Sequence, residues 1–83
     1  MDQTARTAKQ LGQALRRQRR ALGMTQAELG AKTQRRQATI SDLENGAGGT
    51  QIATLVDVLA ALQLELLVRT RGKGASADIE TLF

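Results

Sequence analysis

The sequence predicts an all-α fold: one small domain of four helices, followed by a single β-strand and a short tail. Its 83 residues leave room for one domain. Apolar residues recur at helical spacing in four segments, and glycines or helix-capping residues separate these segments. The sequence contains no proline, so no proline interrupts the predicted helices.

The first helix is expected to run from about Ala8 to Leu22. Leu11, Leu15 and Leu22 fall on one stripe at helical spacing, which predicts an amphipathic helix. Gly23 follows directly, and glycine is the residue that most often terminates a helix.

The second helix is expected to run from Gln26 to about Thr33. Thr25 is a favoured N-cap residue, and Glu28 lies three positions later. This spacing is that of a capping box, in which each side chain accepts a hydrogen bond from the other residue's backbone N–H. The pair therefore predicts where the helix begins.

Residues 34–36 are too few for anything but a turn, and a third helix is expected from about Gln37 to Asn45. Ile40 and Leu43 are spaced so that both face inward, and Gly46 ends the helix. A short helix, a short turn and a second short helix therefore follow one another.

The fourth helix is expected after the loop at residues 47–49, with Thr50 as its N-cap. One broad apolar face is predicted on it, made by Ile52, Leu55, Val56, Leu59 and Leu62.

The apolar spacing then changes from helical to alternating. Leu64, Leu66 and Val68 would share one face of a strand, and Leu67 interrupts the alternation. The segment after Gly72 is rich in Gly and Ser and is expected to be disordered. The predicted organisation is a helical domain over residues 1–63, a strand over 64–71 and a flexible tail over 72–83.

The composition argues for a binding module and against an enzyme. The chain contains no His and no Cys, so it lacks the preferred zinc ligands, the commonest general base and the thiolate nucleophile. We expect no catalytic residue, no metal and no cofactor. The longest apolar run, Val58 to Leu62, is far shorter than the roughly 20 residues of a bilayer span. Because the N-terminus also lacks the apolar core of a signal peptide, we expect a cytoplasmic protein.

The charge is unevenly distributed. Residues 1–36 hold nine basic and two acidic side chains, whereas residues 37–83 hold three basic and six acidic ones. This asymmetry favours a polyanionic partner, although a solvated basic helix would explain the charge alone equally well. Single-stranded nucleic acid is a weaker candidate, because its binding usually needs stacking aromatic rings and Phe83 is the one aromatic residue.

Two short helices joined by a tight turn form a helix-turn-helix. The segments TQAELGAK at residues 25–32 and ATISDLENG at residues 38–46 closely resemble the lambda-repressor-like (XRE) helix-turn-helix family over about residues 10–63. The run RQATIS, the LENG that follows and the later LELLVRTR are most similar to HipB-type antitoxins. The turn departs from the family, which often has Gly where this chain has Gln34, and an apolar residue where it has Thr33 or Arg35.

The resemblance implies that the third helix contacts bases in the major groove of double-stranded operator DNA. Its exposed side is expected to carry Gln37, Ala38 and Ser41, with Arg36 just before it. Gln can bond bidentately to adenine, Ala can contact a thymine methyl, and Arg can reach guanine. The alternative is that Gln37 and Ser41 are ordinary surface residues.

Phosphate contacts are expected from Thr25, Gln26, Thr39 and Arg35. The N-terminus of the second helix presents free N–H groups and a positive dipole end to an anion. In the family, the residue matching Gln26 has this role.

Arg19 lies on the apolar stripe of the first helix, so it should be partly buried and needs a partner. The resemblance supplies Glu44 of the LENG motif as that partner, in a structural ion pair. Arg16, Arg17 and Arg20 point elsewhere and form a basic patch, which either contacts phosphates or is only solvated.

A lone strand would leave unpaired backbone groups on an apolar edge, which is a liability for a monomer. We therefore expect Leu64, Leu66, Leu67 and Val68 to pair with a second copy across a two-fold axis, as the resemblance to HipB-type antitoxins also implies. Such a homodimer would match a palindromic operator.

In the tail, Ile79, Leu82 and Phe83 are spaced for one face of a helix and could bind a protein partner. The alternative is a frayed terminus. By the resemblance, the chain is a repressor and the antitoxin of a HipA-like kinase toxin. The alternative function is that of a stand-alone phage-type or housekeeping repressor without a toxin.

Overall fold

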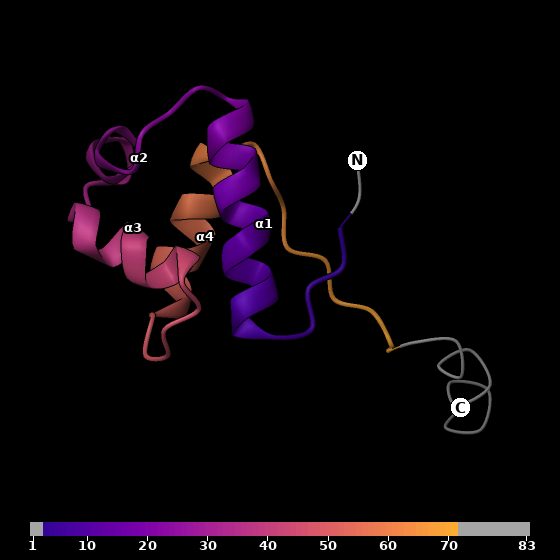
Figure 1. Cartoon of the computed structure of the whole chain (residues 1–83). Coiled ribbons are helices and arrows are strands. Elements are labelled where there is room, and N and C mark those ends of the chain that lie inside the picture. The colour runs from indigo at the N-terminus through magenta and orange to yellow at the C-terminus, as the bar shows by residue number, and fades with distance from the viewer. Residues whose placement is uncertain (1–2, 72–83) are drawn as a thin grey trace, which may run out of the picture.

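The computed structural model describes residues 3–71, which form a bundle of four short helices (Figure 1). The helices are α1 (Ala8–Ala21), α2 (Gln26–Thr33), α3 (Gln37–Glu44) and α4 (Ile52–Ala61). The predicted bounds of α2 are confirmed, and α1 and α3 each end one residue earlier than predicted. None of the helices is long and apolar enough to cross a membrane, within the part of the chain described.

The starts of the first two helices are capped by threonines. Thr7 precedes α1 and its side chain accepts a hydrogen bond from the backbone N–H of Gln10. Thr25 and Glu28 form the predicted capping box at α2. The prediction that Thr50 caps α4 is wrong: the N-cap is Gln51, so Thr50 lies one residue before the cap, outside the helix.

The turn between α2 and α3 depends on two residues that depart from the resembling family. Gln34 has φ 57° and ψ 40°, the left-handed conformation that usually selects glycine. Thr33 is buried, and its hydroxyl donates to the Leu29 carbonyl at 2.9 Å and lies 3.2 Å from the Gly30 carbonyl oxygen. The threonine can occupy an apolar position because its own helix accepts its hydrogen bond.

The core lies between the four helices. Its buried apolar side chains are Leu15, Leu29, Ile40, Leu43, Val58, Leu59 and Leu62. In α4 the prediction was partly wrong, because Ile52 and Val56 are 76% and 48% exposed, whereas Val58 is buried. The buried apolar side chains of this segment are Val58, Leu59 and Leu62, so the inward face is rotated away from Ile52 and Val56.

Two glycines allow α1 and the end of α3 to approach closely. A Cβ at Gly12 would lie 2.7 Å from the Glu44 carbonyl carbon, and a Cβ at Gly46 would lie 2.7 Å from the Lys9 Cα. Gly46 also has φ 76°, which disfavours other residues. The absence of both side chains sets the distance between the two helices.

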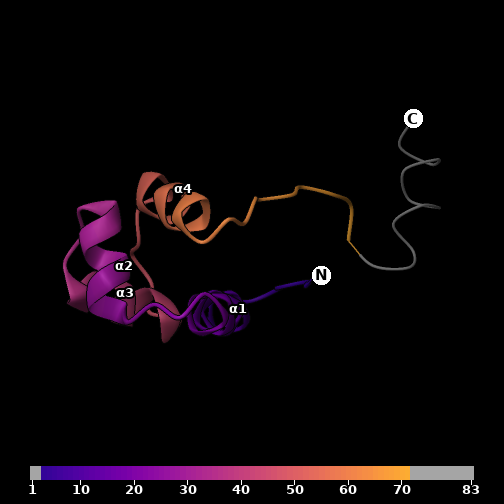
Figure 2. The same ribbon diagram turned by 90° about the horizontal axis from the view of Figure 1, so that it is seen from above.

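The segment after α4 leaves the bundle beside the N-terminal residues (Figures 1 and 2). The Leu64 N–H donates to the Leu59 carbonyl at 2.8 Å, and Arg69 donates to the Thr4 hydroxyl at 3.0 Å. Within residues 3–71 no segment forms a β-ladder, so the strand predicted over residues 64–71 has no pairing partner in the single chain. The predicted tail lies outside the described residues.

Candidate nucleic-acid interface

The second helix of the helix-turn-helix presents one side to solvent. Ile40 and Leu43 are buried and hold α3 against the core. The opposite side carries the predicted base-contacting residues: Gln37 and Ala38 are exposed, and Ser41 is half-buried. Arg36 is exposed at the N-cap position directly before them, so Arg36, Gln37 and Ala38 form an exposed edge at the start of α3, and Ser41 follows Gln37 by one helical turn.

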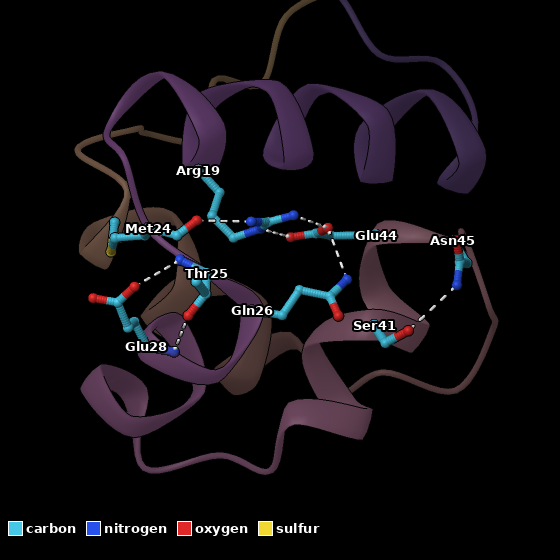
Figure 3. Close-up of polar contacts among 8 residues, drawn as sticks. All are labelled: Arg19, Met24, Thr25, Gln26, Glu28, Ser41, Glu44 and Asn45. Atoms are coloured by element: carbon cyan, nitrogen blue, oxygen red, sulfur yellow. Dashed lines mark hydrogen bonds and ion pairs between the residues drawn. The ribbon is translucent and has the colours of Figure 1, made fainter.

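Ser41 is also engaged within its own helix. The Asn45 side-chain amide lies 3.5 Å from the Ser41 hydroxyl oxygen, as Figure 3 shows. This distance is at the outer limit of a hydrogen bond. The hydroxyl can therefore exchange this contact for another donor or acceptor at little cost.

The N-terminus of α2 lies beside α3. The Thr25 hydroxyl accepts from the Glu28 N–H at 3.0 Å, and the Glu28 carboxylate accepts from the Thr25 N–H at 3.0 Å (Figure 3). The hydrogen bond from the Thr25 backbone, and to a smaller extent the one with the Thr25 side chain, lowers the pKa of Glu28 below its usual value. This exposed end of the helix therefore has a fixed geometry.

A buried ion pair connects α1 to α3. The Arg19 Nε–Glu44 Oε2 distance is 2.6 Å and the Nη2–Oε1 distance is 3.1 Å, while Nη1 donates to the Met24 carbonyl at 2.7 Å. The two side chains are only 8% and 2% exposed. The bidentate geometry satisfies both charges, as burial requires. The structure thus brings together the pair that the resemblance implied.

Gln26 completes this network. It is the first residue of α2, and its Nε2 donates to Glu44 Oε1 at 3.1 Å (Figure 3). One carboxylate therefore fixes side chains from α1 and α2 at once. Because a side-chain amide has two N–H groups, Gln26 retains a second donor for a ligand.

Arg35 has a different environment from the other predicted contacts. Its guanidinium lies 2.9 Å from the Asp57 carboxylate, 3.2 Å from the Thr54 hydroxyl and 3.1 Å from the Thr33 carbonyl. These contacts connect the turn to α4. Arg35 as a phosphate contact stays a prediction, because such a contact would have to compete with these partners.

The remaining predicted site residues lie in three places. Thr39 is half-buried beside a shallow hollow of about 250 Å³ between α3 and the loop after it. Leu64 packs against the core, whereas Leu66, Leu67 and Val68 are 59%, 72% and 87% exposed. The predicted tail residues Ile79, Leu82 and Phe83 lie outside the described residues.

The predicted basic patch on α1 is exposed at all three positions, Arg16, Arg17 and Arg20. Arg17 donates to the Gln3 side chain at 2.6 Å. Among residues 3–71, no group of three or more acidic side chains could hold a metal ion. The surface therefore presents positive charge and hydrogen-bonding groups.

Sequence reasoning missed Gly12, Thr54 and Asp57. A glycine inside a helical apolar stripe costs about 1 kcal/mol relative to alanine, so Gly12 did signal a close approach. No sequence pattern near Thr54 and Asp57 indicated that they would accept hydrogen bonds from Arg35, because these contacts depend on how α4 crosses the turn.

The model of the helix-turn-helix domain family matches residues 10–70 of this chain. Two antitoxins named HipB, from strain K12 and from a second strain of Escherichia coli, are each 39% identical over 57 residues, which is 69% of this chain. That stretch spans 61–65% of the length of these curated relatives.

Solved structures show the same fold. A chain of a structure described as a HipA-HipB-O2-O3 complex superimposes with a TM-score of 0.77 at 32% identity, covering 86% of this chain and all of that one. The clp gene regulator ClgR of Corynebacterium glutamicum has a TM-score of 0.67 at 27% identity, covering 80% of this chain and 85% of that one. The resemblance to XRE-type regulators and to HipB is confirmed.

Proposed function

We propose that this chain, which belongs to the helix-turn-helix domain family, is a sequence-specific repressor. It would bind a palindromic operator as a homodimer. The observation that carries the proposal is the solvent-facing edge of α3, where Arg36, Gln37 and Ala38 are exposed beside the N-terminus of α2. The major groove of B-DNA is wide enough to admit an α-helix that presents such an edge. A protein with this function would act in the cytoplasm, on the nucleoid.

Base recognition is assigned to Arg36, Gln37, Ala38 and Ser41. Gln37 can pair bidentately with adenine, and Arg36 with guanine. Ala38 leaves room for a thymine methyl. The contact of Ser41 with Asn45 is long, so the Ser41 hydroxyl can donate a hydrogen bond to a base edge or accept one from it.

Phosphate contacts are assigned to Thr25, Gln26 and Thr39. The support for Gln26 is the bond to Glu44, which holds its amide at the helix N-terminus with one N–H unused. A donor held in place in this way loses little side-chain entropy on binding. The N-terminal dipole of α2 adds attraction for an anion.

Dimerisation is assigned to the segment over residues 64–71, paired with its copy. Three consecutive apolar side chains, Leu66, Leu67 and Val68, are exposed there in the single chain, and pairing would bury them. Truncation after Gln63 should give a monomer in sedimentation at concentrations where the full chain is a dimer. A fragment that remains a tight dimer would place the interface elsewhere.

We further assign the role of antitoxin to a HipA-like kinase. The support is the similarity to two HipB antitoxins and to the HipB chain of a complex that contains HipA and operator DNA. The tail residues Ile79, Leu82 and Phe83, outside the described range, remain the proposed toxin contact. Deleting residues 79–83 should weaken binding of the kinase and leave operator binding almost unchanged.

A stand-alone regulator without a toxin is the second candidate. The similarity to ClgR, which is described as a regulator of a clp gene, favours it. A titration of the full chain with the kinase encoded beside its gene discriminates between the two. Tight binding supports the antitoxin role, and a neighbourhood without any such kinase supports the stand-alone regulator.

The DNA-binding proposal is tested by selection from a pool of duplexes with a randomised centre, at fixed salt. The full chain should enrich one palindromic sequence. Enrichment of no sequence would contradict the proposal, because non-specific affinity alone comes from phosphate contacts.

A further inference from the structure

Asp42 is an exposed residue on α3, and its carboxylate makes no hydrogen bond or ion pair within residues 3–71. The ion pairs among residues 3–71 are Arg19–Glu44 and Arg35–Asp57, and Asp42 takes part in neither. It lies in the last turn of α3, where the helix dipole disfavours a negative charge. Asp42 lines the hollow between α3 and the loop after it, and no ion pair within the described residues offsets its charge there.

Its place on α3 is next to the proposed base contacts. Asp42 follows Ala38 by one helical turn, and positions four apart lie on the same face. The buried residues Ile40 and Leu43 lie on the other side of the helix. A rise of about 6 Å over four residues would place Asp42 opposite a neighbouring base pair.

A carboxylate at this position affects DNA binding in two ways. Towards the phosphates it is repulsive, so it weakens binding to every sequence. Towards base edges it is only an acceptor. The repulsion is offset only where a base presents a donor, which makes the carboxylate a discriminator between sequences.

We infer that Asp42 is a specificity-determining residue that accepts a hydrogen bond from the N4 amino group of a cytosine. Guanine and thymine present acceptors in the major groove, and adenine presents an acceptor beside its amino donor. Cytosine presents a donor without an adjacent acceptor. The inference rests on the proposed function, since it applies to the same face of α3.

The test uses the full chain and a pool of duplexes with a randomised centre, selected at one salt concentration. Wild type should enrich a cytosine at one position of each half-site. Asp42→Asn should enrich adenine there instead, because Asn pairs bidentately with adenine. On duplexes that differ at this position alone, the variant should lose about tenfold preference for cytosine over thymine.

Asp57→Asn is the matched control, because it makes the same substitution at an exposed carboxylate on α4, away from the proposed base contacts. It should leave the preferred sequence unchanged, and sedimentation should confirm that both variants remain in the oligomeric state of wild type. Asp42→Asn should also unfold at the same or a slightly higher temperature than wild type.

Two outcomes would overturn the inference, and only one of them would also overturn the proposed function. If wild type enriches an operator and Asp42→Asn enriches the same bases at every position, Asp42 has no role in specificity and the proposed function stands. If wild type enriches no sequence, the proposed function fails and the inference fails with it.

Discussion

The Arg19 guanidinium and the Glu44 carboxylate form a bidentate pair, with N–O distances of 2.6 and 3.1 Å, although 25 positions separate them in the sequence. Glu44 also accepts from Gln26. The pair therefore connects the scaffold helix α1 to both helices of the helix-turn-helix, and it holds the proposed phosphate contact in place.

Arg19→Ala should destabilise the fold by about 3–5 kcal/mol, because it leaves the buried Glu44 charge without its partner. Arg16→Ala removes an exposed arginine from the same helix and should change stability by less than about 0.5 kcal/mol. Denaturant midpoints provide the measurement. Equal midpoints for the two variants would mean that the buried pair contributes nothing.

Gly12→Ala should destabilise the protein by about 1–3 kcal/mol, although alanine is the better helix former. The added methyl would lie 2.7 Å from the Glu44 carbonyl carbon, and backbone atoms cannot move aside as a flexible side chain can. Gly48→Ala is the matched control, because its Cβ meets nothing within 4 Å. A Gly12→Ala variant as stable as wild type would show that α1 can shift away from α3 freely.

Gln34→Gly should stabilise the protein, by up to about 1 kcal/mol. The left-handed conformation at φ 57° costs an L-residue roughly 1–2 kcal/mol, and glycine relieves this strain at a smaller cost in chain entropy. Gln13→Gly in α1 should instead lose about 1 kcal/mol. Thermal unfolding of both variants checks the sign, and a loss of stability in both would contradict the account of the turn.

Variants of Arg35 and Asp57 distinguish two possible roles of Arg35: a structural contact with α4 and a contact with a DNA phosphate. Their pair is partly exposed, at 30% and 54%, so Asp57→Asn should cost at most about 1 kcal/mol. Arg35→Ala should cost more, because it also removes the hydrogen bonds to the Thr54 hydroxyl and the Thr33 carbonyl. If Arg35 only connects the turn to α4, both variants should bind operator with the same salt dependence as wild type. A shallower salt slope in Arg35→Ala alone would establish a phosphate contact.

The helices and the capping box were predictable from the sequence because their signals are local. Thr25 and Glu28 are three positions apart, and the spacing of Ile40 and Leu43 identifies the inward side of α3 without knowledge of the fold. The Arg19 pairing needed the family resemblance, since a helical wheel indicates burial and does not identify the partner.

The features that the sequence did not predict depend on how the helices cross. Ile52 and Val56 were expected inside, but α4 has more apolar positions than the small core can cover. The side chain of Arg35 follows the turn to α4 instead of pointing to solvent. Neither outcome is encoded in spacing along the chain, because both depend on contacts between distant segments.

The most direct test of the central claim is one set of anisotropy titrations, with wild type and Gln37→Ala on the selected operator and on a scrambled duplex, at equal salt. Wild type should bind the operator about 10³-fold or more tightly than the scrambled duplex. Gln37→Ala should lose about 1–3 kcal/mol on the operator and almost nothing on the scrambled duplex. Equal affinity of wild type for both duplexes, or an unchanged operator affinity in Gln37→Ala, would contradict the assignment of α3 as the recognition helix.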